Sequence, residues 1–432
     1  MDPKKLFMRP TTKRVLIIGA GAAGLCALKR ALEYNMEPVV YEQTDEIGGY
    51  WNCRKEIPSD KSEEEINCST YEDSFINLPK ELMEYPDYQY SDQLKDSFIL
   101  SMEVLNYLHS YAEHFALRKY IKILHEVIRV RRRNGEWEAF IWNTVANSYD
   151  FEFFDYVFVC TGHNRKPYYP NIPGRELYKG KQMNCHLYRT PQIFKDTNVL
   201  IVCYDICGLD IVKQISKTAD TVYLSHNFLP PPDTTFMSNV IQKPYVKELT
   251  EAGAVFLDDS QVAFSNIIYY TGYQYSYPCL STDCDLRLRN NRVYPLYKHI
   301  ININNPTMAL IGIPTNVIPL QLYDLQVRFA LQYFTYTKEL PSAEEMLREV
   351  EETYEKRLQG GLTERQSHQM GELQYDYYKE LSETADIENI KPVVQKIRAD
   401  FDAKNVSELE SYRNSCYEII DNHNFVKCTI KE

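Results

Sequence analysis

Three glycines near the start of the chain have the spacing of a turn that binds phosphate. A short apolar run, residues 15–18, stops at Gly19, and Gly21 and Gly24 follow before a helical pattern begins. In such a turn the first glycine permits the tight bend, the second lets a pyrophosphate approach the backbone, and the third lets the helix pack on the strand. The free N–H groups and the positive end of the helix dipole then attract the phosphate. We therefore expect residues 1–52 to form a strand-helix-strand unit that holds a dinucleotide.

An acidic residue and a second glycine bend extend this motif. The next apolar run, 38–41, ends at Glu42, whose carboxylate can accept hydrogen bonds from a pair of ribose hydroxyls. Gly48-Gly-Tyr-Trp51 then supplies another bend. Glycines at two such points, with an acid between them, favour the adenosine half of FAD over a structural turn that imitates the fingerprint. The residues expected to contact FAD here are Gly19, Ala20, Gly21, Ala22, Ala23, Gly24, Glu42, Gly49 and Trp51.

The length and charge of the chain limit what it can bind. Its 432 residues are enough for two or three domains with full-sized cores. A formal net charge of −12 at pH 7 argues against nucleic acid and against an anionic membrane surface, because both would be repelled. No run is long enough to span a bilayer, and residues 1–14 lack the apolar core of a signal peptide. We expect a soluble, cytoplasmic protein without a transmembrane segment, and a homo-oligomer is left open.

The cysteines and histidines point away from redox and metal chemistry of the protein itself. Eleven cysteines, an odd number, predict mostly reduced thiols. Cys53 lies where a flavin disulfide reductase would carry a cysteine pair, but the next cysteine, Cys68, is too far along the chain. Cys279 and Cys284 are expected to be unpaired thiols. The nine histidines show no metal-ligand spacing with the cysteines, so we expect no metal site.

A second unit repeats the layout of the first. An apolar run, residues 198–203, is followed by a turn and a helical pattern, and residues 221–224 form the next expected strand. The three glycine positions of the first unit are here Cys203, Asp205 and Gly208. The repeat predicts a second dinucleotide-binding unit whose glycines have mostly been replaced.

Two apolar strands end in a Thr-Gly pair. Residues 155–160 lead into Thr161-Gly162, and residues 267–270 lead into Thr271-Gly272. One interpretation is a buried strand that brings Thr161 and Gly162 to the edge of a nucleotide. A strand that simply stops at a glycine explains the first pair equally well when it is taken alone.

The predicted fold is α/β, with two Rossmann-like dinucleotide-binding domains, one for FAD and one for NADP, and a helical C-terminal extension. A helix is expected from Pro319 to Phe334, and the extension opens at the capping box Ser342–Glu345 with a helix that stops at Gly360-Gly361. The expected boundaries are 1–165 for the N-terminal part of the FAD domain, 166–262 for the NADP-like domain, 263–340 for the C-terminal part of the FAD domain, and 341–432 for the extension.

Over nearly its whole length the chain resembles the flavin-containing monooxygenases, most closely the shorter soluble kind found in insects. The motifs that carry the resemblance are Gly19-Ala-Gly-Ala-Ala-Gly24, Gly48-Gly-Tyr-Trp51, Asn77-Leu-Pro-Lys-Glu81, Tyr85-Pro-Asp87, Cys160-Thr-Gly-His163, Pro170-Asn-Ile-Pro-Gly174, Thr271-Gly-Tyr273, Pro295-Leu-Tyr-Lys298 and Asp324-Leu-Gln-Val-Arg-Phe329.

The resemblance implies an oxidoreductase that uses FAD, NADPH and O₂. In that family the flavin forms a hydroperoxide that oxygenates soft nucleophiles such as small lipophilic tertiary amines and thioethers. The cofactor does the hard chemistry, so the protein supplies orientation and a dry pocket. By position, Asn77 matches the family asparagine whose amide lies over the flavin ring, and we expect it to be the catalytic residue. The resemblance adds Leu78, Thr161, Gly162 and Gln326 to the residues expected at FAD, although Gln326 also fits an ordinary helix position.

The NADP-like half departs from the family pattern in three places. Asp205 would bring a carboxylate close to the position of a pyrophosphate. Asn184 stands at a family histidine position, and Asn227 stands where a basic residue would help hold the 2′-phosphate. The residues expected to form this weakened NADP-like site are Cys203, Asp205, Gly208 and Ser225.

Two alternatives to NADPH-dependent oxygenation follow from these departures. One is a flavoprotein with impaired NADPH use that acts as a slow oxidase or binds an aromatic ligand. The other is an interaction scaffold in which FAD is structural and the acidic C-terminal helices bind partners. The rate at which NADPH reduces the flavin, and the presence of flavin in the purified protein, separate these alternatives.

Restoring glycine in the second fingerprint should improve NADPH binding. Two unit charges about 4 Å apart interact by roughly 4 kcal/mol at an effective dielectric constant near 20, so Asp205 should weaken NADPH binding by about tenfold or more. We expect Asp205→Gly, preferably with Cys203→Gly, to lower the KM for NADPH and to leave the flavin content unchanged. Micromolar binding by the original chain, unaltered in the restored one, would show that Asp205 points away from the phosphate.

Overall fold

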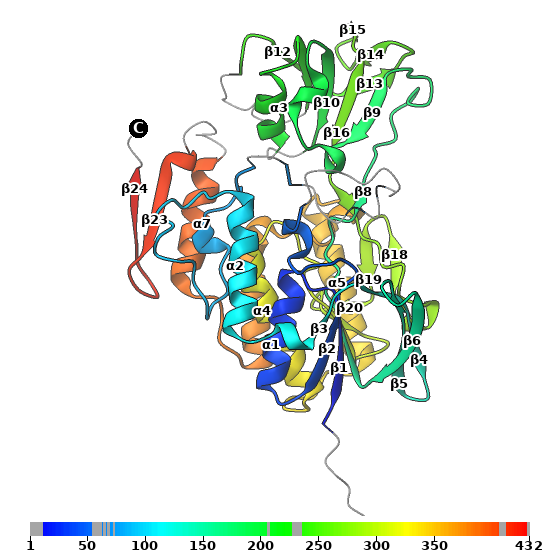
Figure 1. Ribbon diagram of the computed structural model, residues 1–432, viewed down its shortest axis with the longest axis vertical. Helices are drawn as coiled ribbons and strands as arrows, with labels where there is room; N and C mark the ends of the chain where they lie inside the picture. Colours follow the sequence, from blue (N-terminus) through cyan, green and yellow to red (C-terminus); the bar gives the residue numbers. More distant parts are fainter. Residues whose placement is uncertain are drawn as a thin grey trace, which may run out of the picture.

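The computed structural model describes residues 12–53, 63, 66, 70–71, 74–204, 208–226, 236–405 and 412–429. Two α/β units lie one above the other along the long axis of the molecule, and helices from the C-terminal part of the chain line the larger unit (Figure 1). The fold agrees with the predicted pair of Rossmann-like domains.

The first unit is built on a seven-stranded sheet in the order β20-β21-β22-β7-β1-β2-β3. Its centre is parallel, because β1 (Arg14–Ile18) pairs with both β2 (Glu37–Tyr41) and β7 (Tyr156–Val159). Alternate residues of β1 enter separate cores. Val15 and Ile17 face the helical side, whereas Leu16 and Ile18 face the side covered by a second sheet. Both faces of β1 are therefore buried, which explains its uninterrupted apolar sequence.

Helices cover one face of this sheet and an antiparallel sheet covers the other. The helical side consists of α1 (Ala22–Glu33), α2 (Ser101–His114) and α4 (Pro319–Phe334), and α4 has the predicted bounds. The other side is the meander β4 (His125–Arg133), β5 (Glu136–Asn143) and β6 (Ser148–Phe154).

The second unit contains a five-stranded parallel sheet in the order β12-β11-β10-β16-β9. The predicted repeat is confirmed in β10 (Asn198–Cys203), α3 (Leu209–Ile215) and β11 (Thr221–Ser225). The predicted domain boundary at residue 262 is wrong. β16 (Asn266–Tyr270) pairs in parallel with β10, so the second unit continues beyond that residue. Pairing between strands far apart in sequence cannot be read from either strand alone.

Shorter elements complete the two units. They are β3 (Ile121–Lys122), β8 (Lys166–Pro167), β9 (Lys181–Asn184), β12 (Val240–Lys243), β13 (Val246–Leu249), β14 (Gly253–Phe256), β15 (Gln261–Ala263), β17 (Tyr273–Gln274), β18 (Arg287–Arg289), β19 (Arg292–Tyr294), β20 (Leu296–Tyr297), β21 (Ile301–Asn302) and β22 (Met308–Leu310).

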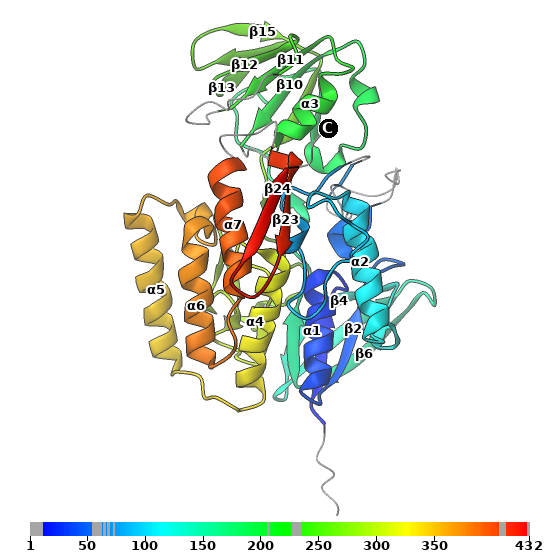
Figure 2. The same cartoon turned by 90° about the vertical axis from the view of Figure 1, so that its left-hand side faces the viewer.

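The C-terminal extension begins as predicted but ends differently. Helices α5 (Ala343–Gln359), α6 (Gln374–Ala385) and α7 (Pro392–Asn405) lie beside α4 (Figure 2). The capping box of Ser342 is present, and α5 ends at the expected Gly360. The extension is not wholly helical, however, because β23 (Ser415–Ile419) and β24 (Phe425–Thr429) form a hairpin beside α7 (Figures 1 and 2).

The thiol prediction is correct only in part. Six cysteines of the described segments are free and buried, among them the expected Cys279 and Cys284. Cys416 and Cys428 instead form a disulfide across the C-terminal hairpin, and Cys53 is also disulfide-bonded. Cross-strand cysteines pair when the hairpin register brings them together, which the cysteine count did not reveal. In the described part of the chain, no helix is long and apolar enough to cross a membrane.

Gly24 should be important for the stability of the fold, whereas Gly21 should contribute little to it. A Cβ on Gly24 would lie 1.9 Å from the carbonyl oxygen of Gly19, whereas a Cβ on Gly21 would lie 3.6 Å from the nearest atom, Cα of Gly49. We expect Gly24→Ala to lower the free energy of unfolding by about 2 kcal/mol or more, since the helix must move off the strand. Gly21→Ala should cost less than about 1 kcal/mol, because Gly21 caps the helix without a close contact. Chemical denaturation measures both. Equal losses would contradict this division of roles.

Candidate functional site

A cavity of about 1220 Å³ lies at the carboxyl ends of the strands of the first sheet. Ile18, Tyr41 and Cys160, at or just beyond the ends of three neighbouring strands, line it. Tyr204 and Ile211 reach its wall from the second unit. The carboxyl edge of a doubly wound sheet is the usual position of a ligand in this architecture.

The two glycine bends meet at one edge of this cavity. Gly19 has φ of +97°, and a Cβ there would lie 2.8 Å from the carbonyl oxygen of Cys160. The N–H of Gly48 donates to the carbonyl of Ala20 at 3.0 Å, which ties the second bend to the first. Gly21 and Gly49 face each other without side chains between them, and both line the cavity. This bare backbone is a cradle that a pyrophosphate fits and that larger side chains would fill.

Glu42 is fixed at the cavity wall by backbone donors. One carboxylate oxygen accepts the N–H of Ala20 at 2.8 Å, and the other accepts the N–H and the hydroxyl of Thr44 at 2.9 and 2.8 Å. The residue is buried and lines the cavity. An ionised carboxylate accepts about four hydrogen bonds, so Glu42 keeps capacity for a ribose hydroxyl.

Asn77 and Leu78 also line the cavity, on a segment without regular structure. Two backbone hydrogen bonds hold this segment: Ile76 N–H to Ile99 O at 3.0 Å and Lys80 N–H to Ser97 O at 2.7 Å. The amide oxygen of Asn77 accepts a hydrogen bond of 2.8 Å from Arg413. Arg413 was not among the expected site residues, because no motif marks that part of the chain.

The structure brings Thr161 and Gly162 to the same cavity, at the end of β7. The Thr161 hydroxyl is buried, and it has no hydrogen-bond partner among the described residues. Gly162 has φ of +71°, and a Cβ there would meet no atom within 4 Å. A buried hydroxyl without a partner beside open space fits a bound polar ligand.

Gln326 lies behind the cavity, outside the described residues that line it. Its amide oxygen accepts the N–H of Gly312 at 2.9 Å, and its amide nitrogen donates to Tyr377 at 3.0 Å. Gly312 does line the cavity, so the contacts of Gln326 shape the wall from behind. Gly312 was not among the residues expected at the cavity. Its φ of +83° marks the turn after β22.

The second fingerprint is only partly described. Cys203 is buried at the end of β10, and a Cβ on Gly208 would lie 2.5 Å from its sulfur. The hydroxyl of Ser225 donates to the carbonyl of Pro244 at 3.0 Å, so it already has a partner. Asp205 and Asn227 lie outside the described residues. The strand, glycine and helix of an NADP-like unit are therefore present, while the position of the Asp205 carboxylate stays a prediction.

Asn184, the second departure from the family pattern, serves a local turn. Its side-chain oxygen accepts the N–H of His186 at 3.0 Å. Nε2 of the buried His186 lies 2.7 Å from the carbonyl oxygen of Ile66, and burial lowers the pKa of this imidazole. These contacts give both residues a structural role.

Burial keeps three thiols and one imidazole of the cavity wall in their neutral forms at neutral pH. Burial raises the pKa of Cys185 to about 12 and that of Cys279 to about 11, and it also raises the pKa of Cys160. Burial lowers the pKa of His163, whose Nδ1 lies 2.9 Å from the carbonyl of Gly312. These thiols and the His163 imidazole therefore supply no thiolate nucleophile and no imidazolium acid. Among the residues that the structure describes, no cluster could hold a metal ion.

The extension also contributes to the wall. Arg398, Phe401 and Asp402 of α7 line the cavity, although no site residue was expected in the extension. No sequence signal marks them, because their approach to the cavity depends on how α7 packs.

Comparisons with known proteins agree with this geometry. The family model for flavin-binding monooxygenase-like proteins matches residues 12–228 and 230–404. The chain is 31% identical to senecionine N-oxygenase of Tyria jacobaeae, over 96% of this chain and 92% of that protein. It is 29% identical to flavin-containing monooxygenase FMO GS-OX2 of Arabidopsis thaliana, over 86% of this chain and 85% of that protein.

Solved structures show the same similarity. S-allyl-L-cysteine S-oxygenase from Allium sativum superimposes with a TM-score of 0.88 at 28% identity, covering 94% of this chain and 95% of that one. Tmm from Pelagibacter sp. strain HTCC7211 has a TM-score of 0.79 at 25% identity, with 93% of each chain covered. The cofactors of this family are FAD and NADPH. With the family model matched along nearly the whole chain and the glycine cradle in place, this protein belongs to the flavin-binding monooxygenase-like family.

Proposed function

We propose that this protein is an FAD- and NADPH-dependent monooxygenase that transfers oxygen from O₂ to nitrogen or sulfur of small lipophilic nucleophiles, of the N,N-dimethylaniline type. The observation that carries the proposal is the convergence of Gly19 and Gly21 of the first fingerprint, Asn77 and Thr161 on one cavity. FAD, when bound, supplies the oxygen chemistry, which no side chain of the wall provides.

Each group of the cavity has a task in this proposal. The bare backbone at Gly21 and Gly49 holds the pyrophosphate, and Glu42 holds the ribose. The free hydroxyl of Thr161 and the amide of Asn77 hydrogen-bond the ring end of the cofactor. Neutral thiols at Cys160 and Cys185 add apolar wall and no competing nucleophile, which suits a site that must exclude water.

Apolar and aromatic residues support the choice of a lipophilic substrate. Tyr323 and Phe401 line the cavity with Ile211 from the second unit. Relatives named N-oxygenase and S-oxygenase make nitrogen and sulfur the first atoms to test.

The cytoplasm stays the proposed compartment. Cys416–Cys428 gives this part of the proposal its own test, because a reducing compartment keeps such a pair as two thiols. Thiol labelling of protein from its native tissue, without added reductant, would report whether Cys416 and Cys428 are two thiols, as expected in the cytoplasm, or a disulfide.

The function is tested by following the oxygen atom. Purified protein with FAD, NADPH and isotopically labelled O₂ should convert a tertiary amine or a thioether into a product one labelled oxygen heavier, as seen by mass spectrometry. NADPH consumption with H₂O₂ as the sole oxygen product, for all amines and thioethers tried, would instead identify a slow oxidase.

Gly21 should control FAD retention. In Gly21→Val the Cβ already touches Gly49, and the two methyl groups must enter the space left for the pyrophosphate. We expect Gly21→Val to lose the flavin and its yellow colour while it stays folded, and Gly21→Ala to keep part of it. Flavin absorbance per protein and circular dichroism measure both properties. Stoichiometric FAD in folded Gly21→Val would disprove the assignment of the cradle.

Asn77 should control how efficiently NADPH is used. Asn77→Leu removes both donors and the acceptor of the amide and keeps the number and branching of the side-chain heavy atoms, so FAD should stay bound. We expect about tenfold more H₂O₂ per molecule of product, the effect of one lost hydrogen bond at a charged centre. The measurement compares NADPH consumed, product formed and H₂O₂ released. An unchanged ratio would make Asn77 a structural residue.

A further inference from the structure

An arginine from the C-terminal segment joins the two units at the cavity. Arg413 lies in the turn Tyr412–Asn414, just before β23. Its Nη2 donates to the amide oxygen of Asn77 at 2.8 Å, across 336 positions of the sequence. Its Nη1 donates to one oxygen of Asp210 at 2.9 Å, and its Nη2 also pairs with the other oxygen. Asp210 belongs to the first turn of α3 in the second unit.

The contact with Arg413 fixes which way the Asn77 amide faces. An amide has an oxygen that only accepts hydrogen bonds and a nitrogen that only donates them, whereas a guanidinium only donates. With its oxygen bound to Arg413, Asn77 has its NH₂ group left to offer to a ligand. A flipped amide would bring its nitrogen against the guanidinium, where two donors meet and no hydrogen bond forms.

Asp210 holds the guanidinium for this contact. A carboxylate that accepts from both terminal nitrogens fixes the plane of the arginine fork as well as its position. The side chains of Arg413 and Asp210 are 25% and 23% exposed, so water screens this pair less than a surface pair. The pair therefore holds the guanidinium in a position from which its Nη2 also reaches the amide oxygen of Asn77.

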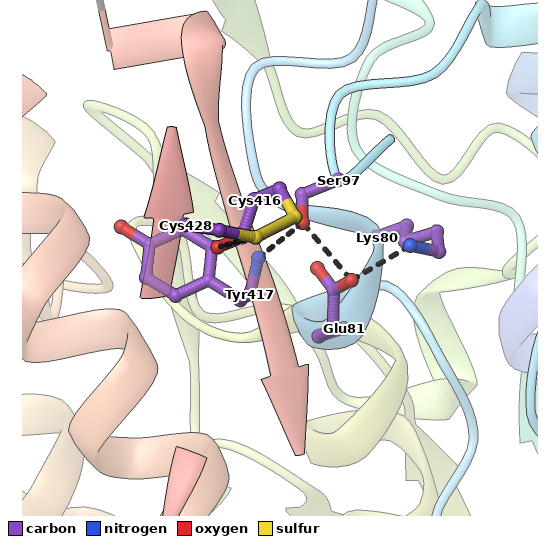
Figure 3. The surroundings of a disulfide bond; sticks show 6 residues. All are labelled: Lys80, Glu81, Ser97, Cys416, Tyr417 and Cys428. Carbon is purple, nitrogen blue, oxygen red and sulfur yellow. Dashed lines mark hydrogen bonds and ion pairs between the residues drawn. A yellow bond between two sulfur atoms is a disulfide. The ribbon is translucent and has the colours of Figure 1, made fainter. Parts of the chain in front are cut away.

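The C-terminal hairpin carries Arg413 to this position. The N–H of Tyr417 donates to the Ser97 hydroxyl at 2.7 Å, and Ser97 donates to Glu81 at 3.0 Å (Figure 3). Ser97 also accepts, through its backbone, the hydrogen bond that holds the segment of Asn77. The hairpin and the Asn77 segment thus share one anchor, and the disulfide Cys416–Cys428 joins the two strands of the hairpin beside it (Figure 3).

We propose that Arg413 is a positioning residue for the oxygenation reaction, which orients the Asn77 amide so that its NH₂ group faces the flavin ring. This inference rests on the proposed function, because it assigns a task to the same site. Arg413 acts through Asn77, and Asp210 with the hairpin keeps it in place.

The test compares Arg413→Met, Asn77→Leu and the double variant in the FAD-loaded protein. Without NADPH, the visible spectrum of the oxidised flavin reports the surroundings of the ring. We expect a spectral shift in the same direction in all three variants, because Asn77→Leu removes the NH₂ group and Arg413→Met releases it from its orientation toward the flavin ring. With NADPH and substrate, Arg413→Met should raise the ratio of H₂O₂ to product by about tenfold, as Asn77→Leu does, and the double variant should add little. Arg413→Lys should give a spectral shift and a product ratio between those of the unmodified protein and Arg413→Met, since it keeps the charge and one donor nitrogen but loses the fork.

Lys427→Met is the matched control. Lys427 is a hairpin cation bound to Asp400 at 2.7 Å, and no contact joins it to Asn77 in the described structure. The Lys427→Met protein should keep the flavin spectrum and the ratio of H₂O₂ to product of the unmodified protein. A normal spectrum and ratio in Arg413→Met, additive effects in the double variant, or an equal change in Lys427→Met would each overturn the proposal. Should Arg413→Met lose FAD, Arg413→Gln replaces it with the same expectations.

These readouts keep the two proposals apart. If the unmodified protein does not oxidise NADPH, the proposed function fails, while the flavin spectrum still tests the link between Arg413 and Asn77. If Asn77→Leu leaves the spectrum unchanged, the assignment of Asn77 to the flavin is wrong, and the inference falls with it.

Discussion

The close approach of two backbone bends is the constraint on which the rest of this site depends. The peptide of Ala20 donates to Glu42 and accepts from Gly48, so one residue joins the first turn, the acid after β2 and the second bend. This close approach is possible only where no side chain separates the two bends, which explains why residues 21 and 49 are glycines. Gly19 instead leaves room for the carbonyl oxygen of Cys160. The surface that results is a row of backbone groups at a helix start, suited to an anion and closed to bulky side chains.

The remaining groups reach the cavity by packing rather than by local geometry. Asn77 lies on an irregular segment that is held by backbone bonds to residues 97–99. The same Ser97 anchors the C-terminal hairpin through Tyr417, so the hairpin is tied to the segment that carries Asn77. Arg413 then connects that segment to Asp210 of the second unit. The surroundings of Asn77 are therefore assembled from three distant parts of the chain.

The parts that the sequence predicted well are those set by local pattern. The strand, turn and helix around Gly19, the helix Pro319–Phe334 and the capping box of Ser342 each follow from periodicity, glycine spacing or capping chemistry within a few residues. The cavity lining at Glu42 and Asn77 followed from the fingerprint and from the family resemblance. In these cases the neighbours along the chain are also the neighbours that matter in space.

The parts that the sequence did not predict depend on partners far away in the chain. The place of β16 in the second sheet is set by its pairing with β10, and the Cys416–Cys428 bond is set by the register of a hairpin that no periodic signal marks. Arg413 is one of many arginine and lysine residues in the sequence that would be expected at the surface. Only the packing of the extension brings it to Asn77. Long-range packing chooses among many equivalent surface residues, so no local pattern identifies the chosen one.

The central claim is that one cavity holds a flavin that NADPH reduces. Anaerobic mixing of the FAD-loaded protein with NADPH in a stopped-flow spectrophotometer tests it most directly, by following the visible band of oxidised flavin. We expect this band to disappear, at a rate that rises with NADPH concentration and then saturates. A flavin that stays oxidised in the presence of excess NADPH, but is reduced at once by dithionite, would contradict it.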